Sequence, residues 1–178
     1  MDELALVSVG PRSQINVRAR GGAVERVAKR LSIPALPGPN RFIATPLGDC
    51  LWLGPEEWLV VGPPSSRAET LEALDQAIGP EDGAAVDLSA SRVLFELKGP
   101  KARDVLASCC ALDFHPRVFG PGRCAQTLVS KAPVLLSQMD EAPTYRLLVR
   151  PSLVSYVISW LADGIEAVRA EAAQPAQP

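Results

Sequence analysis

The sequence predicts an α+β fold made of two similar halves, each arranged as strand, helix, meander and helix. Apolar residues alternate along the first strand of each half, which is typical of a strand with one face in a core. The helices carry apolar stripes, and turn residues divide the segments between them into short strands. Because the plan returns after about 80 residues, we expect an N-terminal half over 1–82 and a C-terminal half over 83–170, packed as one unit. Residues 171–178 are small, polar and proline-rich, and a disordered tail is predicted there.

The first half is assigned from three kinds of local pattern. A strand is predicted over 14–20 and a helix over 24–31, followed by a proline-rich surface loop. Short apolar runs over 42–61, separated by turn residues, indicate an antiparallel meander. Ser66 and Glu69 have the spacing of a capping box, so the second helix is expected to begin there.

The second half is organised around a strand that turns directly into a helix. Val93, Phe95 and Leu97 alternate with polar residues, a pattern that only Leu94 breaks. Gly99 and Pro100 then supply a corner at which a helix begins. A phosphate-binding loop is the functional alternative at such a corner. With one glycine and no G-x-G-x-x-G or G-K-[ST] motif, this segment instead predicts a tight strand-to-helix turn.

A meander and a last helix complete the second half. Strands and a helix are predicted, in order, over 124–129, 134–136 and 145–149 and from residue 152 onward. Over 153–161 the helix is apolar except at Ser155 and Ser159. Such a helix either lies at the centre of the core or packs against a second chain, because a lone surface helix keeps a polar face.

Composition and charge exclude several classes of function. The 178 residues are 47% hydrophobic, which suffices for a globular core. The formal net charge of -2, spread along the chain, gives no electrostatic basis for a nucleic-acid or membrane partner. The N-terminus begins with acidic residues, without a basic region and apolar run, and no segment approaches ~18 consecutive apolar residues. A cytoplasmic protein is expected.

Few residues have the spacing of a catalytic or metal-binding site. The four cysteines, Cys50, Cys109, Cys110 and Cys124, include no C-x-x-C pair, so reduced and mostly buried thiols are expected. His115 is the only histidine, which excludes a His-rich metal site. A structural role in a turn is expected for it, rather than general acid–base catalysis. We therefore predict no catalytic, cofactor-binding or metal-binding residue in this chain.

Two further groups have both a structural and a functional interpretation. Asp87, Ser89 and Ser91 lie on one side of an extended segment and form a possible polar site, but Asp followed by Ser typically organises a turn. Trp52 and Trp58 flank a Gly-Pro turn. They are compatible with an aromatic box around a ligand, although packing in the core is the expected role.

Four segments resemble the gamma subunit of heterotetrameric sarcosine oxidase. They are LWLGPEEWLVVGP (51–63), VDLSASRVLFELKGPKARDVLASCCALDFHP (86–116), GRCAQTLVSKAPVLL (122–136) and YRLLVRPS (145–152). That family is in turn similar to the aminomethyltransferases of the glycine cleavage system. The positions that carry this second resemblance are Asp87 and Ser89, Gly99 and Ala102, and Gly122 and Thr127.

The resemblance implies the folate-binding aminomethyltransferase-type fold, but one difference argues against folate chemistry in this chain. Those enzymes hold their catalytic aspartate in a glycine-rich loop that ends in two acidic residues and lies between the strand after that threonine and the next strand. The corresponding segment here, SKAPVLLSQMDE, is short and lacks glycine, and Asp140 and Glu141 fall in a later turn.

The resemblance therefore implies a non-catalytic assembly subunit of a sarcosine oxidase complex. Such a complex oxidatively demethylates sarcosine to glycine with tetrahydrofolate and oxygen, giving methylenetetrahydrofolate and hydrogen peroxide. FAD, FMN, NAD, zinc and tetrahydrofolate are expected in the other subunits and not in this chain. The expected partners are alpha, beta and delta type subunits, with alpha in direct contact, and the candidate interface residues are Phe119, Val154 and Ile158. A free-standing folate- or one-carbon-binding protein with the same fold is the alternative.

Overall fold

The computed structural model describes residues 4–173. Contacts divide these residues into an N-terminal unit, formed by 10–92 and 122–125, and a C-terminal unit, formed by 4–9, 93–121 and 126–173. The boundary differs from the one expected after residue 82. Strand β6 (Gly83–Asp87), which was expected to open the second half, pairs with the N-terminal unit's own strand β2 (Ser13–Ala19).

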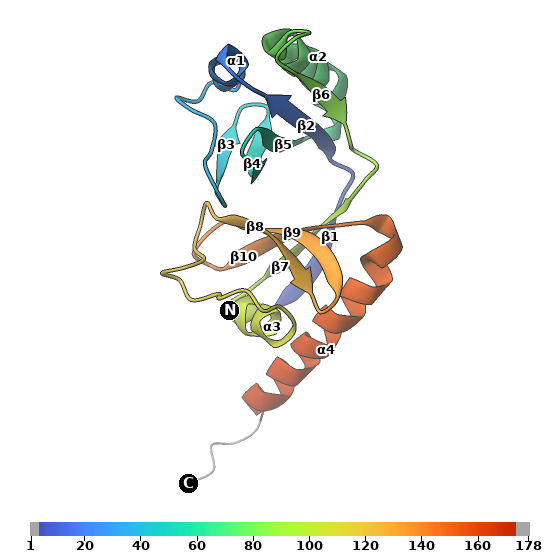
Figure 1. Ribbon diagram of the computed structural model, residues 1–178. Helices are drawn as coiled ribbons and strands as arrows, with labels where there is room; N and C mark the ends of the chain where they lie inside the picture. Colours follow the sequence, from blue (N-terminus) through green and yellow to red (C-terminus); the bar gives the residue numbers. More distant parts are fainter. Residues whose placement is uncertain (1–3, 174–178) are drawn as a thin grey trace. The chain divides into compact units, whose positions relative to one another are not determined.

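The N-terminal unit is a five-stranded sheet with two helices on one face (Figure 1). Its sheet order is β3-β4-β5-β2-β6. Besides β2 and β6, its elements are α1 (Gly22–Arg30), β3 (Phe42–Thr45), β4 (Gly48–Gly54), β5 (Glu57–Gly62), η1 (Pro64–Ser66) and α2 (Arg67–Ile78). The predicted strand, helix, meander and second helix are all confirmed.

The core of this unit lies between its sheet and its helices. In the antiparallel register Ile15 faces Val60 and Val17 faces Trp58, so that alternate residues of β2 and β5 point to the same face. Ile15 and Val17 are fully buried, together with Val27 of α1. The apolar residues that alternate along the strand in the sequence therefore form the face of the sheet on which α1 and α2 pack.

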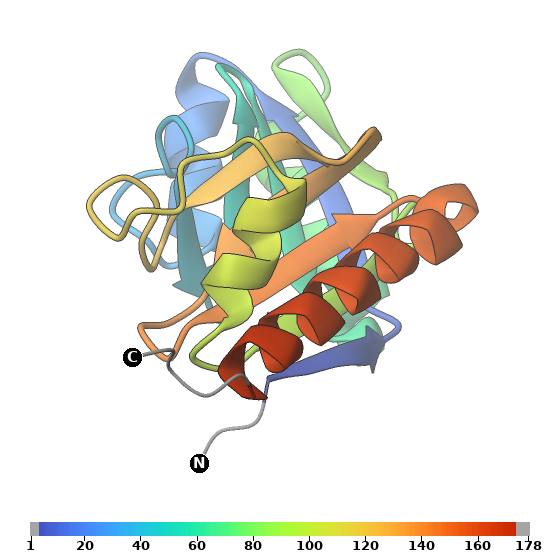
Figure 2. The ribbon, with the colours of Figure 1, turned by 90° about the horizontal axis from the view of Figure 1, so that it is seen from below.

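The C-terminal unit has the same architecture. Its sheet order is β8-β9-β10-β7-β1, and α3 and α4 lie side by side over one face of the sheet (Figure 2). Its elements are β1 (Ala5–Gly10), β7 (Val93–Lys98), α3 (Ala102–Cys109), β8 (Cys124–Val129), β9 (Ala132–Gln138), β10 (Thr144–Val149), η2 (Pro151–Leu153) and α4 (Val154–Ala173). Except for β1 and the short η2, each was predicted from the sequence.

The two sheets correspond strand for strand, with one exchange. In each unit the meander supplies three neighbouring strands, the strand before the first helix lies next to them, and a fifth strand closes the edge. The fifth strand comes from the segment that precedes the other unit's first strand: β6 precedes β7 but pairs with β2, whereas β1 precedes β2 but pairs with β7. The predicted α+β fold with two similar halves is confirmed.

Three details of the predicted elements are wrong. The hydroxyl of Ser66 donates a hydrogen bond to the carbonyl of Pro63 (3.2 Å) and caps no backbone N–H of α2, so the capping box does not form. Helix α3 begins at Ala102, after a turn in which the N–H of Ala102 bonds to the carbonyl of Gly99. Helix α4 continues to Ala173, through the start of the expected disordered tail, and 174–178 lie outside the described residues.

No helix within residues 4–173 is both long enough and apolar enough to cross a membrane. The longest of them, α4, carries charged side chains through its second half.

Candidate functional site

Helix α4 presents two aromatic side chains to solvent. Tyr156 is 38% exposed and Trp160 is 42% exposed, while the residue that follows each of them, Val157 and Leu161, is buried. The two rings meet edge to face, with 6.4 Å between their centroids, which fixes one against the other. The Tyr156 hydroxyl is 2.8 Å from Ser130 Oγ in the β8–β9 turn, and this hydrogen bond lowers the pKa of Tyr156. We call Tyr156 and Trp160 the α4 aromatic pair.

A shallow hollow of about 340 Å³ lies beside this pair. Trp160 and Ser130 form one side of it, and the end of α3 with the residues that follow, 107–111, forms the other. At the base of the two helices, Gly164 of α4 allows close approach to α3, because a Cβ there would lie 3.1 Å from both Ser108 Oγ and Val105 Cγ1. The hollow and the aromatic pair thus belong to one surface built on the α3–α4 contact.

The three predicted interface residues do not form this surface. Phe119 is 4% exposed and packs against Phe114 and Tyr145, with centroid distances of 5.8 and 6.5 Å. The expectation that Phe119 is exposed is therefore wrong, because the loop folds its ring into the C-terminal unit. Val154 and Ile158 are half-buried. At 100° per residue they project on the side of α4 opposite to the aromatic pair.

Helical spacing would have found the aromatic pair. Tyr156 and Trp160 are four residues apart and so share one face, while Val157, Leu161 and Ile165 share another. The latter three are buried, at 1%, 1% and 9% exposure, as is Gly164. The apolar content of segment 153–161 as a whole does not show this division of the helix into two faces.

The cysteines are buried free thiols, as predicted. All four are buried and unbridged. Burial raises the pKa of Cys50 to about 12, with further contributions from Cys124 and Asp49, and raises the pKa of Cys109 and of Cys124 to about 11. Because the thiolate is the reactive form, these three thiols are poor nucleophiles at neutral pH.

The other polar candidates organise turns. The Asp87 carboxylate accepts hydrogen bonds from the N–H and the hydroxyl of Ser89 (2.9 and 2.5 Å), which lower its pKa, with a smaller contribution from Arg67. His115 is exposed, and its Nδ1 accepts a hydrogen bond from the N–H of Arg117 (3.2 Å). Both arrangements are the local side-chain-to-backbone bonds expected from the sequence.

The β8–β9 connection is a two-residue turn. It consists of Ser130 and Lys131, and Ser130 takes a left-handed φ of 51°. Asp140 lies in the later β9–β10 turn, where its carboxylate accepts hydrogen bonds from the N–H groups of Ala142 and Thr144 (3.0 and 2.8 Å). Among the described residues, no group of three or more His, Cys, Asp or Glu side chains is placed to hold a metal ion.

A charged hollow of about 580 Å³ lies at the end of β2 in the N-terminal unit. Its arginines are engaged within the chain: Arg18 pairs with Glu57 at 3.0 Å, and Arg20 donates to the carbonyl of Glu81 at 3.0 Å. The second oxygen of Glu57 accepts a hydrogen bond from Asn16 (2.8 Å). This set of charges therefore joins β2, β5 and the segment before β6.

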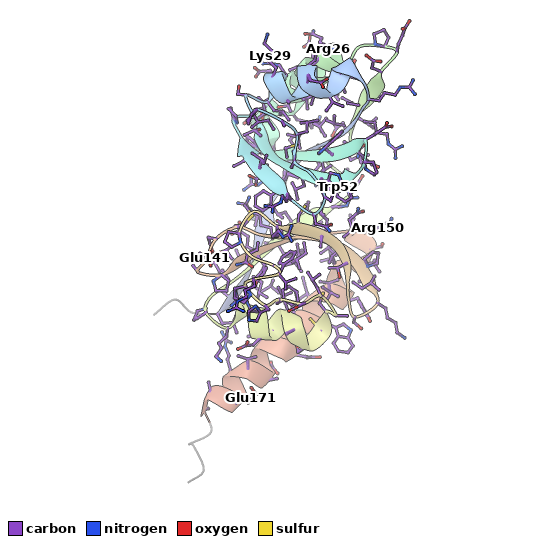
Figure 3. The ribbon with its side chains drawn as sticks, turned by 60° about the vertical axis from the view of Figure 1, so that its left-hand side comes forward. Arg26, Lys29, Trp52, Glu141, Arg150 and Glu171 are labelled. Atoms are coloured by element: carbon purple, nitrogen blue, oxygen red, sulfur yellow. The ribbon has the colours of Figure 1, made fainter. Side chains whose placement is uncertain are left out.

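The two tryptophans of the meander differ in their surroundings. They face each other across β4 and β5, but Trp58 is 5% exposed and donates its Nε1–H to the carbonyl of Pro37 (2.9 Å), whereas Trp52 is half-buried. Both rings line an apolar hollow of about 380 Å³. Figure 3 shows Trp52, with Arg26 and Lys29 on α1 of the same unit. The core role is confirmed for Trp58, while Trp52 also forms part of a surface.

Comparison with known proteins identifies the family. Residues 19–167 match the model of the sarcosine oxidase, gamma subunit family. Sarcosine oxidase subunit gamma of Corynebacterium sp. (strain P-1) is 40% identical over 121 residues, which are 68% of this chain and 58% of that protein. The match thus spans little more than half the length of this relative.

Solved structures agree with the sequence match. A chain of the heterotetrameric sarcosine oxidase from Corynebacterium sp. U-96, in complex with pyrrole 2-carboxylate, is 32% identical with a TM-score of 0.82, over 92% of this chain and 84% of that one. The glycine cleavage system aminomethyltransferase T from Bartonella henselae is 15% identical with a TM-score of 0.67, over 88% of this chain and 44% of that one, which is a likeness of fold alone. The chain belongs to the sarcosine oxidase gamma subunit family.

Proposed function

We propose that this chain is a non-catalytic assembly subunit of a cytoplasmic sarcosine oxidase complex. The complex oxidatively demethylates sarcosine to glycine, transfers the one-carbon unit to tetrahydrofolate and reduces oxygen to hydrogen peroxide. Its partners are alpha, beta and delta type subunits, with alpha in direct contact. Family membership supports this proposal, and the relative from Corynebacterium sp. U-96 is part of a heterotetrameric sarcosine oxidase.

The chemistry of the described residues is compatible with a role in assembly. Three of the four thiols are held neutral by burial, and the single histidine bonds to its own turn. The segment 130–141 has no glycine, which supports the absence of a glycine-rich acidic loop like that of the folate enzymes. The bound groups expected for such an oxidase, FAD, FMN, NAD, zinc and tetrahydrofolate, are therefore assigned to the other subunits.

The α4 aromatic pair is the observation that carries the assembly role. Tryptophan and tyrosine are, with arginine, the side chains most enriched at the energetic centres of protein interfaces, and a contiguous exposed apolar patch is typical of an interaction site. Here the two rings are held together and lie beside a hollow that a partner side chain can enter. The α4 aromatic pair and the adjoining hollow form the proposed contact surface for the alpha type subunit.

Co-expression with the alpha, beta and delta type subunits tests the proposal. A partner that binds only the folded chain and is present at a hundred times its Kd stabilises it by about 2.7 kcal/mol. For a chain of this size we expect the melting temperature to rise by roughly 5–11 °C. The tagged chain should also recover the other three subunits and sarcosine-dependent peroxide formation.

A monomeric chain that recovers none of these subunits, and is no more stable in their presence, would contradict the proposal. Titration with tetrahydrofolate distinguishes the alternative. Saturable binding to the chain alone would favour a free-standing folate carrier, whereas the assembly role predicts none.

A further inference from the structure

The apolar hollow in the N-terminal unit has the features of a small-molecule site. Its volume of about 380 Å³ falls within the range of ~300–1,000 Å³ that such sites occupy. One side is the outer surface of α1, and the other is the proline-rich loop 34–39 with the β4–β5 turn. Trp52 and Trp58 supply the aromatic part of the wall.

The walls are fixed by the fold. The indole N–H of Trp58 bonds to the carbonyl of Pro37, which ties the loop to the sheet. Trp52 sits directly opposite Trp58 in the β4–β5 register. Pro34, Pro37 and Pro39 restrict the backbone of the loop, because the proline ring fixes φ. The site is therefore preformed, and ligand binding costs little free energy for ordering the loop.

The lining favours a particular ligand chemistry. Aside from the two indoles, it consists mainly of proline and aliphatic side chains, and the Trp58 N–H is already used. Glu25, exposed on α1, is the one charged side chain among the lining residues that the structure describes. Aromatic faces attract cations, and a carboxylate at the rim adds negative potential, whereas apolar walls penalise a group that must keep its hydrogen bonds.

We propose that this hollow binds a small quaternary ammonium group, whose methyl surface suits the apolar walls and whose charge suits the indole faces and Glu25. A quaternary ammonium has no N–H to satisfy, so its burial leaves no donor unpaired. This proposal does not depend on the role of the chain in assembly, since all the lining residues lie in the N-terminal unit and the α4 aromatic pair lies in the other.

Calorimetric titration of the full chain with choline chloride and with 3,3-dimethyl-1-butanol tests the proposal. The alcohol has the shape of choline without its charge, so it reports apolar binding alone. We expect saturable binding of choline that is about threefold to thirtyfold tighter than that of the alcohol, the range of a cation–π contribution. Equal affinities, a preference for the alcohol, or no saturable binding of choline would overturn the proposal.

Two variants locate the site, and a third is their control. Trp52→Leu should weaken choline binding by about threefold to thirtyfold, because it removes an aromatic wall. Glu25→Gln should weaken it by about twofold to fivefold, as for an exposed charge pair, and should reduce its dependence on salt. Trp160→Leu removes a tryptophan of the C-terminal unit and should leave choline affinity unchanged. Melting curves establish that each variant is folded, and unchanged affinity in folded Trp52→Leu would place the site elsewhere and refute the proposal.

Discussion

Lysine substitutions at two neighbouring positions of α4 should separate its partner-facing side from its core side. Trp160 is 42% exposed, so in Trp160→Lys the ammonium stays in water while the aliphatic stem covers part of the same surface. We expect a cost of about 1–2 kcal/mol, which lowers the melting temperature of the free chain by roughly 2–8 °C. Leu161 is 1% exposed. Leu161→Lys loses about 1.5–3 kcal/mol of apolar burial and also buries an unpaired charge, a penalty of about 3–5 kcal/mol.

The sum for Leu161→Lys is about 4.5–8 kcal/mol, which equals the stability of a domain in the lower part of the usual range of about 5–15 kcal/mol, so the free chain should lose most or all of its stability. Trp160→Lys should fold but lose its partner: removal of an interface hot spot costs about 2 kcal/mol or more, which weakens binding at least about 30-fold. Circular dichroism melts and quantitative co-purification with the alpha type subunit measure the two effects.

The control is Glu171→Lys, which adds a lysine at an exposed position of the same helix, about 16 Å along its axis from Trp160. This variant should fold and assemble like the unmodified chain. If Trp160→Lys is folded and binds the alpha type subunit as tightly as Glu171→Lys does, the α4 aromatic pair is not the interface.

Two further predictions concern the stability of the free chain. Because burial raises the pKa of Cys50, Cys109 and Cys124 from 9.0 to about 12, 11 and 11, the unfolded chain loses these protons first. The free energy of unfolding gained from the neutral thiols is present in full below pH 9 and is lost as the pH rises through the pKa values of the folded state. Denaturant titrations at pH 8 and pH 10 will detect this loss. Equal free energies of unfolding at the two pH values would contradict the raised thiol pKa values. Trp58→Phe leaves the Pro37 carbonyl without its indole donor and should cost about 1–3 kcal/mol, seen as a melting temperature lower by roughly 2–12 °C. An unchanged melting temperature would show that this bond does not hold the loop.

Elements whose signal is local were predictable from the sequence. The alternation of Val93, Phe95 and Leu97 gave β7, and the Gly99-Pro100 corner gave α3 to within two residues. Leu94 breaks the alternation in the sequence, and the structure supplies the reason. Leu94 is 2% exposed, and its neighbours on the same face, Leu148 and Leu135, are each 4% exposed. A strand buried on both faces has no simple period, so the expected sheet with only one covered face is wrong here.

Features that depend on distant residues were not predictable. The loop around Phe119 is rich in glycine and proline, which indicates a surface turn, yet the ring stacks on Tyr145 of β10. Ser66 has the spacing of a capping residue, but η1 precedes α2, and this extra turn brings the Pro63 carbonyl within reach of the hydroxyl. In both cases a tertiary or neighbouring contact displaces a local preference.

The same limit applies to the candidate sites. The two tryptophans of the meander could be recognised as a pair in the sequence. The hollow beside them also needs the proline-rich loop, which is held against the sheet by the hydrogen bond from Trp58 to Pro37, 21 residues away. The α4 aromatic pair required the helix to be divided into faces. Because α4 packs closely against α3 at Gly164, Tyr156 and Trp160 lie on the side of the helix that stays exposed.

The exchange of edge strands explains why the unit boundary could not be read from the repeat. A repeat in the sequence assigns each strand to the half in which it occurs, and β6 occurs directly before β7. Strand pairing is decided instead by which sheet edge is open, because an edge strand needs backbone partners and an apolar face but no particular neighbour in the sequence. The edge of β2 takes β6 and the edge of β7 takes β1, so each sheet is completed by a strand that the local order assigns to the other. A division of the chain after residue 82 would therefore remove one edge strand from each sheet, and each of the two halves contributes a strand to the structure of the other.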